Sequence, residues 1–189
     1  RSRPRLLATG GLLDDSWFNR IAWSIDKQAL GQYLVFDDSS AYGIRAYNRP
    51  TDVNAHFTPG SAGYLLFAND HHRPESGNSR SAAAAKRARG KSGPQDRWAV
   101  RMPIRARAMV LAGEHLFAAG TPDIVDADDP WAALDGRRGG VLWAVAADSG
   151  ERLAEHELDA APVYDGMAAA ADRLYLSGQD ENLGKPLFR

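Results

Sequence analysis

Apolar residues recur along this chain in short runs, and polar corners separate one run from the next. Residues 109–120 read MVLAGEHLFAAG, an apolar run, a small and polar corner, and a second run that contains an aromatic residue. Two short apolar runs joined by a few turn-forming residues are typical of a β-hairpin. We therefore expect two antiparallel strands here.

The same pattern occurs three times. Residues 167–178 (MAAAADRLYLSG) match residues 109–120 at the opening Met, the turn, a Leu, an aromatic residue and the closing Gly. Residues 34–45 (LVFDDSSAYGIR) form a weaker copy with the apolar start, the polar turn and Tyr42. Repetition of this kind indicates stacked supersecondary units. The copies lie farther apart than the roughly 40 to 50 residues of common propeller repeats, so we expect insertions between them.

Two insertions stand out in composition. Residues 73–97 are poor in large apolar residues and rich in Ser, Gly, Ala and basic residues, which predicts a mobile, solvated surface loop. Its basic patch lacks the interleaved aromatic residues that stack on bases. Residues 121–140 contain five aspartates without the spacing of a calcium loop. We expect a solvated acidic loop, partly pinned by Pro122, Pro130 and Trp131 as an ordered lid over one blade.

The stretch 142–158 (LWAVAADSGERLAEHEL) contains a further corner, Asp148-Ser149-Gly150, between an apolar run and a mixed run. Glycine readily adopts the positive φ that tight turns often require. We therefore expect Gly150 to help reverse the chain between two strands of one sheet.

Composition narrows the possible functions. The 23 basic and 24 acidic residues nearly cancel, so no overall field draws the protein to nucleic acid or to an anionic membrane. Cysteine is absent, which excludes disulfides and thiolate chemistry but does not identify a compartment. The chain begins without Met and without the apolar run of a signal peptide, and we expect a fragment or a processed product.

Three stretches, residues 10–20 (GGLLDDSWFNR), 105–158 and 161–178, together resemble the C-terminal part of quinoprotein-like (PQQ-binding-like) β-propeller repeat proteins of the planctomycete type. The resemblance implies an all-β fold of β-propeller-type blades, each with four antiparallel strands, around a channel. The 189 residues would supply about four blades, a partial propeller that spans the whole chain as one domain.

Residues 142–150 resemble the blade signature in which a strand ends in Asp, a small residue and Gly. In that family a Trp usually follows a few residues later and docks on the neighbouring blade. Here Leu153 and Ala154 stand in its place, so Trp143 and Trp98 are the candidates for closing this interface.

The resemblance also raises the question of a cofactor. Quinoprotein dehydrogenases hold PQQ and Ca²⁺ in the channel, often beside paired cysteines. Because cysteine is absent and no stretch places the other groups recognisably, we expect neither a cofactor nor an enzyme, and PQQ with calcium is the alternative. Neither a Ser-His-Asp arrangement nor a phosphate-binding glycine loop is visible. The adjacent His71 and His72 would point to opposite faces of a strand, which disfavours a metal site.

Two places supply our candidate ligand contacts, which are Asp14, Asp15, Trp17, Arg107 and Asp165. The first three lie in a stretch dense in polar and aromatic groups after the turn at Gly10-Gly11, which we expect to face a ligand in the channel. The last two lead into innermost strands, and such positions line a propeller channel. For the first three, the alternative is that the carboxylates cap turns or pair with Arg20 or Arg45, while the indole packs between blades. For the last two, the favoured alternative is an ion pair between them.

These expectations favour a non-catalytic binding or assembly scaffold that is part of a larger PQQ-like β-propeller repeat protein. Its partners would be other protein segments or subunits that complete the propeller, with no nucleic acid and with membrane contact only through partners. The resemblance implies a periplasmic or otherwise exported protein. Two alternatives stay open: a quinone- or metal-dependent oxidoreductase domain, and a structural subunit of a multi-protein membrane complex.

Overall fold

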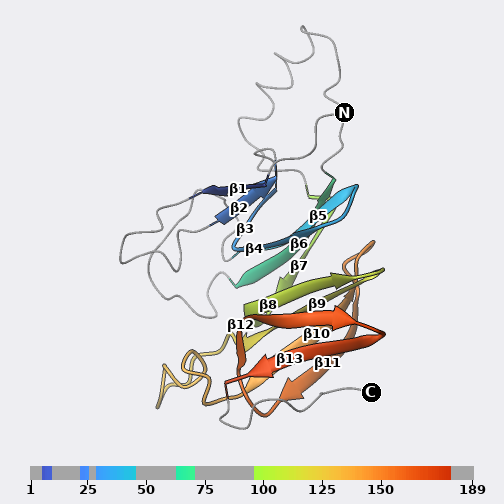
Figure 1. Ribbon diagram of the computed structural model, residues 1–189. Helices are drawn as coiled ribbons and strands as arrows, with labels where there is room; N and C mark the ends of the chain where they lie inside the picture. Colours follow the sequence, from blue (N-terminus) through green and yellow to red (C-terminus); the bar gives the residue numbers. More distant parts are fainter. Residues whose placement is uncertain (1–5, 10–21, 26–28, 46–62, 71–95, 180–189) are drawn as a thin grey trace, which may run out of the picture.

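The computed structural model describes residues 6–9, 22–25, 29–45, 63–70 and 96–179. These ranges form thirteen strands and contain no helix, and every strand pairing is antiparallel (Figure 1). The predicted all-β class is confirmed.

The strands form four successive sheets, in which neighbours along the chain are also neighbours in space. Sheet A contains β1 (Leu6–Thr9), β2 (Ala22–Ile25) and β3 (Ala29–Gly31). Sheet B contains β4 (Tyr33–Phe36), β5 (Ser40–Arg45), β6 (Tyr64–Asp70) and β7 (Trp98–Met102). Sheet C contains β8 (Ile104–Ala112), β9 (His115–Pro122), β10 (Gly140–Ala146) and β11 (Arg152–Leu158). Sheet D contains β12 (Pro162–Ala170) and β13 (Arg173–Gly178).

The three predicted hairpins are confirmed, and each opens one sheet. Residues 34–45 fall on β4 and β5, residues 109–120 on β8 and β9, and residues 167–178 on β12 and β13. The predicted insertions lie between strands of single sheets: residues 123–139 connect β9 to β10, and most of residues 73–97 lies outside the described residues, between β6 and β7.

The sheets are stacked face to face like the blades of a propeller (Figure 1). Single residues, Gln32 and Pro103, connect β3 to β4 and β7 to β8. From sheet B to sheet D, the first strand of one sheet lies beside the first strand of the next, β4 against β8 and β8 against β12. With two four-stranded sheets between two shorter ones, the described residues form a partial propeller.

The main core lies between sheets B and C, because alternate residues of each strand face the neighbouring sheet. Leu66 and Ala68 of β6 are fully buried there, as are Leu116 and Ala118 of β9. Trp143 of β10 joins the same core at 5% exposure, and its indole Nε1 donates a hydrogen bond to Glu155 (2.8 Å).

The corner at residues 148–150 has two roles. Gly150 has φ +78°, and its N–H donates to the Ala146 carbonyl (2.9 Å), which closes the turn between β10 and β11. The indole of Trp98, from sheet B, lies against this glycine and donates to the Ala147 carbonyl (3.1 Å). The prediction that Trp98 and Trp143 close the interface is thus confirmed.

Candidate functional site

Arg107 lies where the first strand of sheet C leaves its regular pairing. The β8–β9 register shifts between Ala106 and Ala108, so Arg107 occupies a β-bulge that redirects its side chain. The residue is 4% exposed. Its Nη1 donates to the Pro162 carbonyl (3.3 Å) and its Nη2 to the Leu134 carbonyl (2.6 Å). Arg107 therefore ties β8 to the start of β12 and to the acidic loop.

Asp165 lies on a second irregularity, in β12. The β12–β13 register shifts between Pro162 and Met167, and Asp165 has φ +55° with an exposed side chain. The favoured ion pair between Arg107 and Asp165 is not formed within the described part of the chain. Both terminal nitrogens of Arg107 donate to main-chain carbonyls instead, whereas its buried Nε has no hydrogen-bond partner among the described residues.

Two tyrosines complete a group at the starts of three consecutive inner strands. The Arg107 guanidinium lies 5.3 Å from the centre of the Tyr164 ring. Tyr33 is the first residue of β4. It lies near enough to Tyr164, Asp165 and Arg107 for these groups to act on its pKa. Burial above all, and then Tyr164 and Asp165, raise the pKa of Tyr33 above its usual value, while Arg107 opposes the shift. We call Tyr33, Arg107, Tyr164 and Asp165 the inner-strand cluster.

The inner-strand cluster offers aromatic and hydrogen-bonding groups rather than a reactive pair. Tyr33 is protonated at neutral pH, as an ordinary tyrosine is, and burial raises its pKa further, so it offers a hydroxyl rather than a base. Tyr164 is 47% exposed, so its ring and hydroxyl can contact a ligand directly. Arg107 is less suited to that role, since its terminal nitrogens are engaged and its side chain is buried.

The remaining sequence candidates fall partly outside the described residues, as Asp14, Asp15, Trp17, His71 and His72 all do. Two of their neighbours are described. Arg45, considered as a partner for the N-terminal aspartates, pairs with Asp96. Asp70, next to the two histidines, pairs with Arg97 (2.9 Å). Among the described residues, no group of three or more His, Asp or Glu side chains is placed to hold a metal ion.

The acidic loop is held by arginine. Arg137 pairs with Asp129 and with Asp135, and Arg138 pairs with Asp126. The Arg137 hydrogen bond lowers the pKa of the Asp129 carboxyl. The aspartates are therefore largely matched by neighbouring cations, in line with a surface loop.

The Trp131 side chain, which was expected to help pin this loop together with Pro122 and Pro130, is 54% exposed. Ala132 and Ala133 are buried instead, and the Leu134 carbonyl accepts the Arg107 hydrogen bond. Small residues and one carbonyl thus fasten the loop beside β12.

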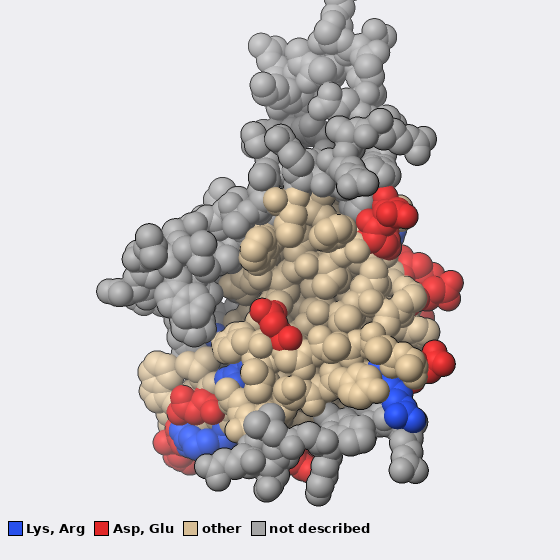
Figure 2. All heavy atoms as spheres, in the orientation of Figure 1, with Lys and Arg blue, Asp and Glu red and all other residues tan. Residues whose placement is uncertain are grey.

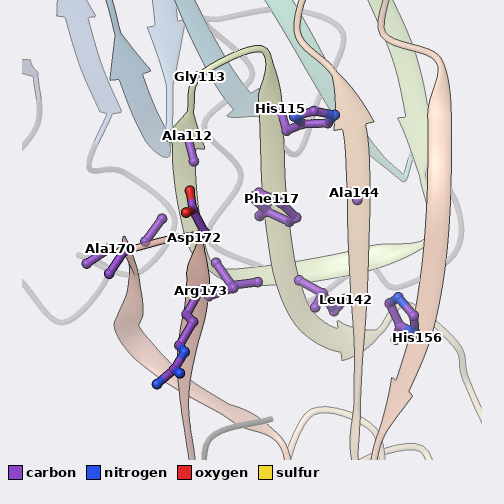
Figure 3. A pocket seen from close by; sticks show the side chains of 13 residues that line it. Ala112, Gly113, His115, Phe117, Leu142, Ala144, His156, Ala170, Asp172 and Arg173 are labelled. Carbon is purple, nitrogen blue, oxygen red and sulfur yellow. The ribbon is translucent and has the colours of Figure 1, made fainter. Parts of the chain in front are cut away.

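A groove that the sequence did not predict lies between sheets C and D (Figure 3). It has a volume of about 570 Å³ and is lined by β9, β10 and β11 on one side and by the β12–β13 hairpin on the other. Phe117 and Leu142 form its apolar floor beside the small Ala144, as Figure 3 shows. His115 and His156 lie at its borders. The only sequence signal was the run of alternate apolar positions on β9 and β10, which marks a second buried face.

These features define an all-β protein of stacked, propeller-type sheets, with an inner-strand cluster and an open groove between sheets C and D. Comparison with known protein families gives no match, and neither does comparison with curated protein sequences. Within the described ranges, no helix could span a membrane.

Proposed function

We propose that this chain is a non-catalytic binding or assembly scaffold, a partial propeller within a larger PQQ-like repeat protein. Other protein segments or subunits would complete it. The observation that carries the proposal is that the described strands cover one face of sheet C in part. One face of sheet C is covered by a four-stranded sheet, whereas the other face meets the two described strands of sheet D.

The surface around sheet D supports this proposal. Tyr164 and Tyr175 are 47% and 42% exposed on the β12–β13 hairpin. Figure 2 shows that the face in view is largely free of charged side chains, which gather mainly at its margins. Contiguous uncharged surface with exposed aromatic residues is typical of protein contact sites. Stacked repeats, moreover, bury their faces only against neighbours.

The oxidoreductase alternative has weaker support from the geometry. It would require the inner-strand cluster to contact a cofactor, whereas Arg107 is committed to two carbonyls and to the Tyr164 ring. A periplasmic or otherwise exported location rests on the family resemblance alone and forms part of the proposal.

Native mass spectrometry of the protein purified from its source cells tests the scaffold function. We expect a complex that contains further polypeptide besides the 189 residues. A mass that equals this chain plus a retained small molecule, without other polypeptide, would contradict the scaffold and favour a ligand-bearing domain.

A further inference from the structure

The outer strand of sheet D, β13, has an open edge within the described residues. In sheets B and C the second strand pairs with a third, β5 with β6 and β9 with β10. Sheet D contains only β12 and β13 in the described part of the chain. The edge strand of sheet C, β11, carries Arg152, Glu155 and Glu157, whereas β13 has one charged residue, Arg173, at its start. Charge discourages added strands, so β13 is the more receptive edge.

The internal repeat indicates how a strand would pair with β13. In sheet C, Leu116 and Ala118 of β9 lie opposite Val145 and Trp143 of β10. The repeat places Leu174 at the position of Leu116, and Leu176 two residues farther on, at the position of Ala118. Leu174 and Leu176 face sheet C, just as Leu116 and Ala118 face sheet B. The orientation of the two hairpins is therefore the same.

The groove next to β13 lies between sheets C and D, and the space between sheets B and C is filled by a side chain from the third strand of sheet C. Between sheets B and C, Trp143 projects from the third strand into the core and is almost fully buried. Between sheets C and D, the open groove of about 570 Å³ lies beside Leu174 of β13, over Phe117, Leu142 and Ala144. A bulky apolar side chain on a strand beside β13 would enter this groove.

We propose that the groove and the β13 edge together form a strand-addition site. The occupant is a polypeptide segment of two strands, the first of which pairs antiparallel with β13 and places a bulky apolar side chain over Phe117 and Leu142. This inference rests on the proposed scaffold function and names its partner: a strand pair that extends sheet D as β10 and β11 extend sheet C.

The chain contains a suitable probe, since β10 and β11 already occupy this position in sheet C. A fluorescent synthetic peptide of residues 140–158 is titrated into the 189-residue protein, and its anisotropy is followed. We expect saturable binding and slowed amide hydrogen exchange in β13. The same peptide with Trp143→Ala should bind at least about tenfold more weakly, because it lacks the side chain that fills the groove.

A matched pair of protein variants locates the binding. Ala144→Trp fills the groove from its own wall and should weaken binding at least about tenfold. Ala168→Trp places the same side chain on an exposed position of β12 that does not line the groove, and binding should be unchanged. Circular dichroism verifies the fold of each variant. If Ala144→Trp does not fold, the comparison of the wild-type and Trp143→Ala peptides still tests whether the groove takes the bulky side chain.

Three results would overturn the strand-addition site: no saturable binding, equal binding of the two peptides, or equal binding by wild type and folded Ala144→Trp. Protection of β13 that depends on protein concentration alone would assign the groove to a second copy, and would also overturn it. None of these results decides the scaffold function, which rests on the polypeptide partners found by native mass spectrometry.

Discussion

Gly150 satisfies two requirements at once. Its φ of +78° lies in the region that costs other L-residues free energy, and its Cα faces the Trp98 ring so closely that a methyl group would lie 2.6 Å from a ring carbon. The first requirement follows from the turn and was predicted from the sequence. The second arises between two sheets, and the sequence could only name Trp98 as a candidate for that interface.

A pair of glycine substitutions separates the two requirements. Gly113 also has a positive φ, +59°, but a methyl group there would meet nothing within 4 Å. Gly113→Ala should therefore lower the free energy of unfolding by about 1 kcal/mol, the cost of the backbone conformation alone. Gly150→Ala should cost about 2 to 4 kcal/mol, because Trp98 must also move. Urea unfolding measures both values, and equal costs would show that Trp98 docking is not rigid.

Arg107 poses the choice between a structural tie and a ligand contact. Lysine keeps the positive charge, but its single ammonium group lacks the planar, two-pronged guanidinium that donates to the Pro162 and Leu134 carbonyls at once. We expect Arg107→Lys to lower the free energy of unfolding by about 1 to 3 kcal/mol, whereas Arg101→Lys, at an exposed position, should change it by less than about 0.5 kcal/mol. Chemical denaturation compares the two variants. An unchanged stability in Arg107→Lys would contradict the structural role.

At the scale of elements, the two best-matched hairpins use different turns. The β8–β9 turn has Gly113 at positive φ, whereas the β12–β13 turn places Ala171 (φ +48°) and Asp172 (φ +59°) in that region. Two consecutive positive φ angles define a type I′ turn, for which Asn-Gly is the favoured sequence. The β12–β13 hairpin is therefore formed at some conformational cost.

Replacing this turn should stabilise the protein. In the double variant Ala171→Asn, Asp172→Gly, both residues adopt a positive φ at lower conformational cost. The variant should therefore raise the free energy of unfolding by about 1 to 2 kcal/mol. Thermal and urea unfolding provide the measurement. A loss of stability would mean that the native side chains make contacts that outweigh the strain.

The acidic loop should respond to pH. Its hydrogen bond to Arg137 lowers the pKa of Asp129 in the folded protein below the usual 3.8. A lowered pKa means that the contribution to stability is complete above the unfolded pKa and is lost as pH falls through the folded pKa. The NMR titration of the Asp129 side chain should therefore have its midpoint below pH 3.8, and Asp129→Asn should remove that titration. A midpoint at or above 3.8 would contradict the Arg137 contact.

Local patterns predicted elements well, and long-range contacts poorly. The three hairpins and the corner at Gly150 follow from alternating apolar residues and turn chemistry within a dozen residues. The carbonyl partners of Arg107 lie on distant parts of the chain, at Leu134 and Pro162, and two β-bulges turn Arg107 and Asp165 away from simple pairing. Such irregularities depend on tertiary packing. The groove was missed because it arises from the number of strands in sheet D.

At the scale of the whole molecule, sheets B and C form the most complete unit. A four-stranded sheet buries one face of sheet C, and the docking of Trp98 fastens the outer strands. Among the described residues, the opposite face of sheet C is buried where β12 and β13 cover it. The described part of the chain therefore combines two well-packed four-stranded sheets with one face that the described strands cover in part, and that contrast underlies both the scaffold function and the strand-addition site.

Hydrogen–deuterium exchange of β13 tests this account most directly, with the isolated 189-residue chain compared with the assembly purified from source cells. Amides at an open edge exchange rapidly, whereas those paired with a further strand are protected. The account predicts rapid exchange at Leu174 and Leu176 in the isolated chain and slow exchange in the assembly. Rapid exchange at both residues in the assembly would contradict it, because the edge of sheet D would then remain unpaired where the protein functions.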